Sequence, residues 1–416
     1  MSKQLPLYAV IALILASIVV TFCATYAGIG LKLLEKNNPN DSASDGVTFD
    51  SSEHEDAFEK LKYVDELYQK YYVGDIDKEQ LEAGLIKGYI AGAGDKYASY
   101  MTKDDFDSYL SDINGEFVGI GVHVVYNAEY ACIEVISVMP DSPALEAGIE
   151  SGDLIVKIGE ESVSDLGYYP AIDKVLGEEG TEVELTIRQI SDGKERTVKL
   201  MRSRIEIDTV SGKMLDGNIA YIKLTQFTDG AAEKFNAKLK ELNDNHPESL
   251  IIDLRNNPGG ILPEAISIAG SFVNTDEIVT YTLNKDGDRK DYRAEHSDDG
   301  VFIKDIPIII LTNSGSASAS EVLSGALRDL GIAKTLGEKT FGKGIVQTVM
   351  GIGTSGILTV TTDRYYTPKG VCIHGVGIEP DYSVEMSDEK TARLTTLDAS
   401  EDDQLKEAIK ILKENK

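Results

Sequence analysis

The sequence predicts a multidomain α/β protein, in which an apolar N-terminal segment and a helical segment precede a small β-rich domain and an α/β core. Length is the first observation, because 416 residues exceed one domain of about 150 and suggest two or three folded units. The second is hydrophobic periodicity, which changes along the chain from helical to alternating and then to buried strands separated by helices. The predicted units are 1–31, 32–55, 56–112, 113–203, 204–385 and a helical tail, 386–416.

Composition excludes several classes of protein. The chain has 42% hydrophobic and 27% charged residues, as globular proteins do. Its 41 Lys and Arg against 70 Asp and Glu give a net charge of −29, which would repel phosphates and argues against nucleic acid as a partner. The 3 cysteines form no CxxC pair, so we expect neither a disulfide framework nor a metal site. No cofactor is expected.

The N-terminus is predicted to enter a membrane. Residues 7–31 carry no charge and exceed the roughly 20 residues that a helix needs to cross a bilayer. A cleaved signal peptide is the alternative, although its apolar region is usually only about 7–15 residues long. Bulky Phe22 before Cys23 disfavours a lipoprotein site. We therefore expect an uncleaved single-pass anchor, followed by a polar tether over 35–55.

A helical segment is expected to follow the tether. Apolar residues recur at helical spacing from Asp56 until Gly74, a suitable stop. Asp77 can cap a second helix, with Gln80 three residues further on. The expected buried face of that helix comprises Leu81, Leu85, Ile86 and Tyr89. We expect this pair of helices to have a packing role only.

The run from Gly119 to Ile207 predicts a small β-rich domain, because short alternating or β-branched segments dominate it. Inside it, Ser142 can cap a short helix that has Pro143 at its first position. The sequence 142–155 resembles bacterial PDZ domains. In such domains a glycine-rich loop, matched here by Gly119-Ile120-Gly121, directs backbone N–H groups at a peptide's terminal carboxylate while the peptide adds as a strand.

Beyond Ile207, strands alternate with helices, which predicts an α/β core. The strand expected at 306–312 is almost wholly apolar, as a strand covered on both faces would be. Reactive residues of such cores belong in the loops at strand ends. Three such loops stand out, at 256–260, 314–321 and 337–347. Each alone is explained by a turn, a helix cap or a solvated lysine, so the case for function depends on all three.

Two patterns resemble nucleotide-binding loops, and both fail on context. Residues 337–343 spell G-x-x-x-x-G-K, but Gly344 stands where a Ser or Thr would reach Mg²⁺, and an extended segment follows instead of a helix. Residues 351–356 spell the dinucleotide fingerprint, but the β-branched run 357–362 comes next. Neither nucleotide class is expected to bind.

The three loops together favour a hydrolase that works without histidine. A serine hydroxyl is a weak nucleophile and needs a base, and a lysine can be that base when burial keeps its amine neutral. Phe341 and Ile345 are suited to desolvate Lys343. Gln347 could orient the amine without adding a charge that would hold its proton.

The tetrahedral intermediate of such a reaction also needs donors for its oxyanion. Backbone N–H groups at a glycine turn and at a helix N-terminus suit this role. Gly259 or Gly260, together with Ala319, is expected to supply them.

From about Asp56 to its end, the chain resembles the carboxyl-terminal processing peptidases, also called tail-specific proteases. The resemblance implies that Ser318 is the nucleophile, Lys343 the general base and Gln347 its orienting partner. It also implies a crotonase-like, ClpP-like ββα-spiral core that cleaves proteins near their C-termini without metal, while the PDZ domain selects the tail and gates activity. We expect the catalytic body on the extracytoplasmic side. The motifs are DLRNNPGG at 253–260, SASASE at 316–321, TFGKGIVQ at 340–347, YTPKG at 366–370 and GIEPD at 377–381.

Two positions depart from the family pattern. Val175-Leu176-Gly177 replaces Ile-Arg-Gly, so Leu176 stands where the family often has a gating arginine. Asp95-Lys96-Tyr97 replaces a common Asp-Pro-Tyr. Neither departure touches the expected Ser–Lys pair.

Three alternatives compete with this interpretation. A histidine triad would have to use His374, the only histidine near the matched motifs. An inert, membrane-tethered PDZ scaffold would not need Ser318, Lys343 and Gln347 all intact. An acyl-CoA enzyme on the same core would explain neither the PDZ module nor the anchor. A homo-oligomer stays open, as does whether the helix within 402–416 packs on the core or on another subunit.

Overall fold

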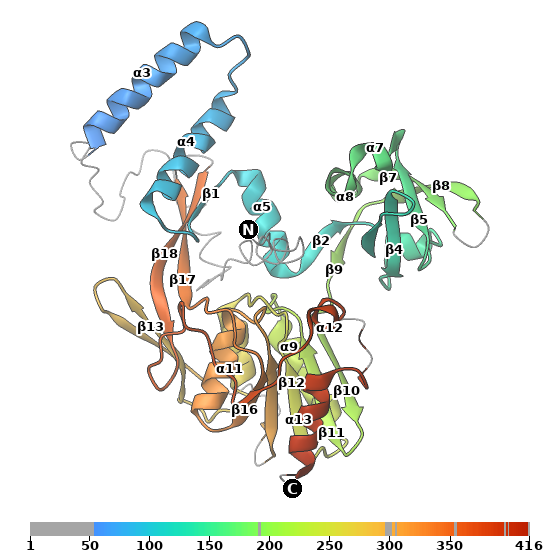
Figure 1. The fold of residues 1–416 in the computed structure, drawn as a ribbon, viewed down its shortest axis with the longest axis vertical. Coiled ribbons are helices and arrows are strands. Elements are labelled where there is room, and N and C mark those ends of the chain that lie inside the picture. Colours follow the sequence, from blue (N-terminus) through green and yellow to red (C-terminus); the bar gives the residue numbers. More distant parts are fainter. Residues whose placement is uncertain are drawn as a thin grey trace.

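A computed structural model describes residues 54–189, 193–295, 302–303, 306–352, 356–394, 397 and 399–414 (Figure 1). The expected anchor at 1–31 and nearly all of the tether lie outside the described residues. Among the helices that are described, none is both long and apolar enough to cross a membrane.

Three helices and one short strand form the first described segment. Asp77 caps the second helix by accepting hydrogen bonds from the backbone N–H groups of Glu79 and Gln80, at 3.0 and 3.1 Å, which confirms the expected start. The elements are α3 (Glu55–Tyr71), α4 (Lys78–Ala93), β1 (Ser99–Met101) and α5 (Lys103–Asn114).

The expected buried face of α4 is wrong. Leu81, Leu85 and Tyr89 are exposed, Ile86 is half-buried, and neither α3 nor α4 contains a buried residue. Figure 1 shows that both helices project away from the core, where the sheets and their covering helices bury apolar side chains. The segment is also not wholly helical, because β1 leaves it to pair with a strand of the core, β18 (Gly356–Tyr366).

The β-rich domain forms as predicted and encloses its own hydrophobic core, built around Ile133, Val135 and Leu185. Ser142 accepts a hydrogen bond from the backbone N–H of Leu145 at 3.3 Å and so caps the short helix that starts at Pro143. Its sheet runs in the order β3-β4-β5-β7-β8, with β6 paired to β5. The strands are β3 (Val122–Asn127), β4 (Cys132–Val138), β5 (Leu154–Ile158), β6 (Glu161–Ser162), β7 (Glu182–Arg188) and β8 (Glu195–Met201), and the helices are α6 (Pro143–Glu146), α7 (Val163–Leu166) and α8 (Tyr168–Val175).

Two antiparallel strands, β2 (Glu116–Gly119) and β9 (Ser203–Glu206), carry the chain into and out of this domain (Figure 1). The core that follows contains a six-stranded sheet of order β10-β11-β12-β15-β16-β19, in which only β10 is antiparallel to its neighbour. The strands are β10 (Val210–Leu215), β11 (Ile219–Leu224), β12 (Ser249–Asp253), β15 (Ile308–Thr312), β16 (Ala333–Gly337) and β19 (Tyr382–Ser383).

Helices cover both faces of the six-stranded sheet, which is why every residue of β12 and β15 is buried. One face packs against α9 (Ala231–Asn243), α10 (Leu262–Ala269) and α11 (Ala319–Asp329). The other packs against α13 (Asp403–Glu414) through Leu405, Ala408 and Leu412. The helical tail, which also includes α12 (Asp388–Ala392), therefore packs on the core of its own chain.

A second sheet lies beside the first and receives the N-terminal segment. Its order is β1-β18-β13-β14, and β17 pairs with β18. The register of β1 places Ser99 opposite Thr359 and Tyr100 opposite Leu358. The remaining strands are β13 (Ile278–Asn284), β14 (Arg289–Arg293) and β17 (Ile345–Ile352), the last confirming the extended segment expected after Lys343.

A buried ionic network joins α13 to the sheet. The guanidinium of Arg255, whose side chain is 2% exposed, donates to both carboxylate oxygens of Asp253 and to both of Asp402, over 2.6–2.9 Å. It also donates to Gln404 at 3.1 Å. Because Arg255 directly precedes the loop at 256–260, the network fixes the base of that loop against the C-terminal helix.

Replacing Arg255 with Ala is expected to lower the free energy of unfolding by about 3–5 kcal/mol, because two buried carboxylates lose their counter-charge. Urea denaturation measures the loss. The matched control is Lys410→Ala, which removes an exposed pair with Glu407 on α13 and should cost at most about 1 kcal/mol. Equal losses in the two variants would contradict a buried network.

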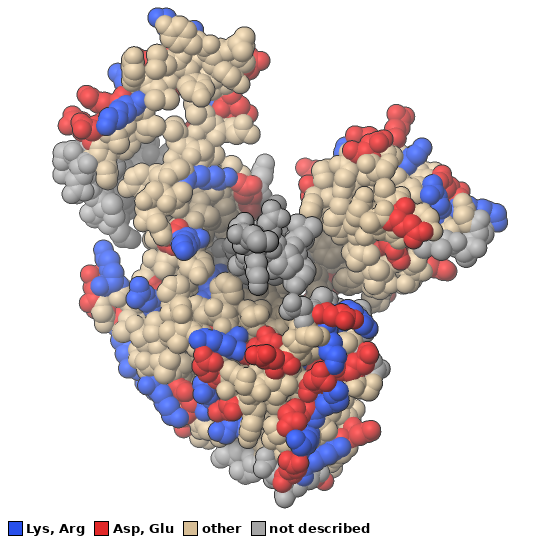
Figure 2. Space-filling model, in the orientation of Figure 1, with Lys and Arg blue, Asp and Glu red and all other residues tan. Residues whose placement is uncertain are grey.

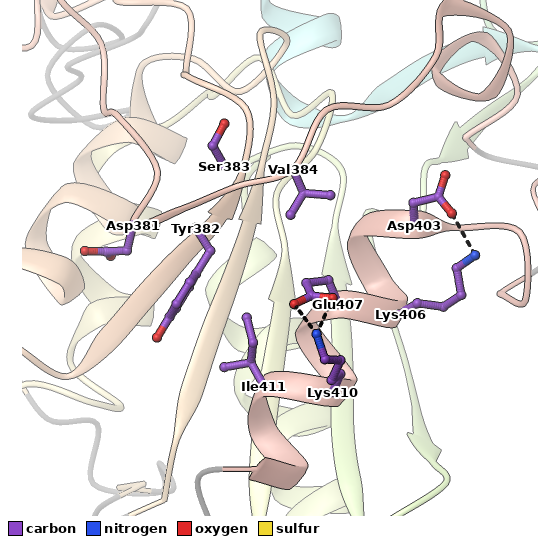
Figure 3. A pocket seen from close by; sticks show the side chains of 9 residues that line it. All are labelled: Asp381, Tyr382, Ser383, Val384, Asp403, Lys406, Glu407, Lys410 and Ile411. Carbon is purple, nitrogen blue, oxygen red and sulfur yellow. Dashed lines mark hydrogen bonds and ion pairs between the residues drawn. The ribbon is translucent and has the colours of Figure 1, made fainter.

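A pocket lies between β19 and α13, and exposed ion pairs line it (Figure 3). Lys406 pairs with Asp403, and Lys410 pairs with Glu407. None of the site residues predicted from the sequence lines this pocket. In the face drawn in Figure 2, acidic and basic side chains are interspersed over the part of the core that carries α13.

Candidate active site

Ser318 occupies the position before α11 in a strained backbone conformation. Its φ of +56° lies in the left-handed region, which a residue other than glycine rarely adopts. The side chain is buried, at 1% exposure. Its backbone is held from two sides, since its N–H donates to Glu321 and its carbonyl accepts from the N–H groups of Glu321 and Val322. Such strain persists only where the surrounding structure fixes it, and it is commonly found at functional sites.

The carboxylate of Glu321 joins the serine loop to the lysine loop. Its Oε2 accepts from the backbone N–H groups of both Ser318 and Lys343, each at 2.8 Å. Its Oε1 accepts from the N–H of Gly342 at 2.7 Å and from the hydroxyl of Thr340 at 2.5 Å. Burial raises the pKa of Glu321, while these hydrogen bonds act to lower it. Two loops that lie far apart in sequence thus share one buried acceptor.

The sequence analysis assigned no role to Glu321, although it quoted the SASASE motif that contains it. A serine N-cap followed three residues later by a glutamate does signal a capping box. That signal predicts the local bond to Ser318 but not the bonds to residues 340–343, which depend on how the loops pack.

Lys343 is buried, at 1% exposure, as the sequence predicts. Burial lowers the pKa of its amine to about 8, against the opposing effect of the negative charge of Glu321. Roughly one amine in ten is therefore neutral at pH 7. Of its two expected apolar neighbours in sequence, Ile345 is buried but Phe341 is 38% exposed. An aromatic ring that the sequence analysis did not identify, that of Tyr97, has its centroid 5.7 Å from the amine.

Gln347 is also buried, but its hydrogen bond differs from the one expected. Its side-chain nitrogen donates to the backbone carbonyl of Tyr97. Its oxygen Oε1 is buried and has no hydrogen-bond partner among the described residues. In this conformation, then, Gln347 does not accept a hydrogen bond from Lys343, and the orienting contact expected from the sequence is not formed.

The glycine turn packs directly against the serine. A Cβ added to Gly259 would lie 2.8 Å from the Cβ of Ser318 and 3.0 Å from the backbone nitrogen of Ala319, so only glycine fits there. The N–H of Gly259 is already donated to Oδ1 of Asn257 at 2.9 Å. Among the expected oxyanion donors, this engagement favours Gly260 and Ala319 over Gly259. The N–H of Ala319 lies in the first turn of α11, where N–H groups have no intrahelical partner.

His374 lies in the same cluster of side chains. Its ring packs edge-on against Tyr97, with centroids 5.8 Å apart, and its buried Nδ1 has no hydrogen-bond partner in the part of the chain that the structure describes. Burial lowers the pKa of His374, as does the nearby charge of Arg364. These contacts are those of a packed, neutral histidine.

The predicted peptide-binding loop, Gly119-Ile120-Gly121, links β2 to β3, which is an edge strand of its sheet. Gly121 has φ +77°, and a Cβ there would lie 2.3 Å from the Cβ of Ser142, so packing alone requires glycine. Helix α8 borders β3, because Tyr168 donates to the carbonyl of Val124 at 3.4 Å. Leu176 lies beside Gly119, where its Cδ2 would be 3.2 Å from an added Cβ.

The fold and the buried serine and lysine loops define a serine-type peptidase with an accessory β-domain. The chain is 34% identical over 342 residues to a carboxy-terminal-processing protease of Bartonella bacilliformis, a match that covers 80% of this chain and 77% of the relative. It is 33% identical over 366 residues to the carboxy-terminal processing protease CtpB of Bacillus subtilis, covering 87% and 75%. The chain belongs to peptidase family S41, as a carboxy-terminal processing peptidase.

Family models divide the chain in agreement with the fold. Residues 218–384 match peptidase family S41, residues 134–189 match a PDZ domain, and residues 18–105 match the N-terminal domain of the activating protease CtpB. Among solved structures, a putative S41 protease from Bacteroides fragilis has the same fold, with a TM-score of 0.55 at 15% identity, over 83% of this chain and 93% of that one.

Proposed function

We propose that the chain is a membrane-anchored endopeptidase that cleaves proteins near their C-termini with a Ser318–Lys343 dyad. The observation that carries this proposal is the burial of Lys343, which brings its pKa to about 8 in a loop that shares the Glu321 carboxylate with Ser318. A neutral amine beside a serine hydroxyl is the arrangement that activates a serine without histidine.

In the proposed mechanism, the neutral amine of Lys343 takes the proton of the Ser318 hydroxyl as the oxygen attacks the scissile carbonyl carbon. The N–H groups of Gly260 and Ala319 stabilise the resulting oxyanion. When the C–N bond breaks, the ammonium of Lys343 returns the proton to the leaving amine. Neutral Lys343 then takes a proton from a water molecule as the water oxygen attacks the acyl carbon, and the ammonium returns that proton to the Ser318 oxygen when the ester bond breaks. Gln347 orients the lysine through its oxygen Oε1, which the hydrogen bond from its amide nitrogen to Tyr97 leaves available.

We propose that the PDZ domain binds the C-terminal tail of the protein substrate. An edge strand such as β3 has unpaired backbone groups, to which an extended peptide adds as a further strand. The loop at 119–121 stands at the start of β3, where the terminal carboxylate would bind. Leu176 beside this loop carries no charge, so gating through an arginine at this position is not proposed.

Replacing Ser318 with Ala is expected to abolish cleavage, with kcat/KM reduced at least about 10³-fold, because the nucleophile is lost. The assay incubates the full-length protein in detergent with peptides that end in apolar residues and identifies the products by mass spectrometry. The matched control is Ser314→Ala, which removes an exposed hydroxyl of the same loop and should cleave normally. Cleavage by Ser318→Ala at the wild-type rate would refute Ser318 as the nucleophile.

An inert PDZ scaffold is not favoured, because Ser318, Lys343 and Gln347 are all present and all buried around one cluster. The proposed location is the cell membrane, with residues 7–31 as anchor and the body on the extracytoplasmic side. Its support is the uncharged run in the sequence. Alkaline carbonate extraction should leave the full chain in the membrane and release a variant that lacks residues 1–31. A homo-oligomer stays a prediction.

A further inference from the structure

The segment that follows α4 is fastened to the catalytic core by one carboxylate. Oδ1 of Asp95 accepts from the backbone N–H groups of Tyr97 and Ala98, at 3.0 and 3.2 Å, and from the hydroxyl of Thr361 at 3.0 Å. Its Oδ2 accepts from the N–H of Thr361 at 3.1 Å. Strand β1 then pairs with β18 from Ser99 onward. Tyr97 is thus held in a fixed position on the core.

From this position, Tyr97 contacts three side chains of the candidate site. Its ring centroid lies 5.7 Å from the amine of Lys343 and 5.8 Å from the ring of His374. Its backbone carbonyl accepts the hydrogen bond of the Gln347 amide. Burial raises the pKa of the Tyr97 phenol, and the negative charge of Glu321 raises it further, so the ring lies within electrostatic reach of the carboxylate that joins the two loops.

We propose that Tyr97 is a positioning residue of the active site, whose ring keeps water from the amine of Lys343 and whose carbonyl holds the Gln347 amide. The residues between α4 and β1 would therefore supply one wall of the catalytic site. This inference rests on the proposed Ser318–Lys343 dyad, because it assigns the neighbour that keeps the lysine neutral.

The direction of the effect follows from the groups around Lys343. Glu321 favours the ammonium, and so does the face of the Tyr97 ring, although 5.7 Å is close to the outer limit of about 6 Å for such attraction. Burial outweighs both, since the pKa lies below that of free lysine. Arg364 and Asp95 act on His374, whose lowered pKa keeps it neutral above pH 7. Removing the ring should therefore admit water and raise the pKa of Lys343.

The test is the pH profile of kcat/KM between pH 7 and 10 for full-length Tyr97→Ala and Tyr97→Phe. In Tyr97→Ala, the midpoint of the rising limb should move upward by about one unit, with about tenfold lower activity at pH 7 and recovery at high pH. Tyr97→Phe keeps the ring, so its midpoint should match that of wild type. A purely structural role would lower activity equally at every pH.

An unchanged midpoint in Tyr97→Ala would overturn the inference, as would an equal shift in Tyr97→Phe, which would implicate the hydroxyl instead of the ring. If Tyr97→Ala does not fold, as judged by thermal unfolding, Tyr97→Leu fills part of the same space and carries the same two outcomes. Failure of the dyad itself is distinguishable, because Ser318→Ala or Lys343→Ala would then still cleave. If Ser318→Ala and Lys343→Ala are both inactive but the midpoint of Tyr97→Ala is unchanged, the dyad stands and only the proposed role of Tyr97 is refuted.

Discussion

Lys343→Ala is expected to lose at least about 10³-fold in kcat/KM, because the proposed general base for Ser318 is removed. Lys343→Arg should be equally inactive, since a guanidinium stays protonated in proteins. Adding Ser318→Ala to either variant should cost little more, because the two residues act as one unit. Binding of a tail peptide to the PDZ domain, measured by fluorescence anisotropy, should be retained in all four variants.

Removing the amine of the same lysine is expected to increase the stability of the fold, although it abolishes catalysis. Its pKa is about 8 in the folded protein, against 10.5 for the free side chain. Between these values the unfolded state binds more protons, so stability rises with pH over this window, and at pH 7 the buried amine is a net cost. Lys343→Met, which keeps the shape without the charge, should raise the free energy of unfolding at pH 7 by about 1–3 kcal/mol while abolishing cleavage.

Urea denaturation at pH 7 and pH 10 separates the two effects. The advantage of Lys343→Met over wild type should shrink at pH 10, where the wild-type amine is neutral in the folded state although still mostly protonated in the unfolded state. If Lys343→Met were less stable than wild type at pH 7, burial of the Lys343 amine would not destabilise the folded state. Cleavage by Lys343→Met would remove the lysine from the mechanism.

The features that the sequence predicted correctly are those that depend on residues close together in the chain. The cap at Ser142 and the cap at Asp77 each follow from residues within one helical turn. The buried strand β15 follows from the apolar run at 306–312, and the burial of Lys343 from its apolar and glycine-rich surroundings. Each of these inferences needed a dozen residues or fewer.

What the sequence could not supply depends on contacts between distant segments. The hydrogen bond from Gln347 to Tyr97 joins residues 250 positions apart, so no local pattern in the sequence could predict it. The apolar spacing of α4 predicted a buried face, but neither α3 nor α4 has a buried residue in the part of the chain that the structure describes. The bond from Gly259 to Asn257, by contrast, is local, and an Asn two residues before a turn glycine was a signal that could have been used.

Glu321→Gln is expected to damage both stability and catalysis, because the buried carboxylate accepts four hydrogen bonds and an amide cannot. If Oε2 becomes the NH₂ group, the backbone N–H groups of Ser318 and Lys343 face a donor. If Oε1 does, the backbone N–H of Gly342 faces one, while the hydroxyl of Thr340 can turn to accept. Each buried group left unpaired costs about 1–3 kcal/mol. We expect a loss of about 2–5 kcal/mol in the free energy of unfolding, measured by urea denaturation. Glu407→Gln, an exposed acid on α13, is the control.

The catalytic effect of Glu321→Gln has two separable parts. Misplacing the serine and lysine loops relative to each other should lower the plateau of kcat/KM at high pH by about 10²-fold. Removing the negative charge that holds up the pKa of Lys343 should move the rising limb to lower pH. If Glu321 only stabilised the fold, its replacement would leave the midpoint of the rising limb of kcat/KM unchanged. A limb that moved to higher pH would therefore contradict the role of Glu321 as the charge that opposes deprotonation of the lysine, whatever happened to stability.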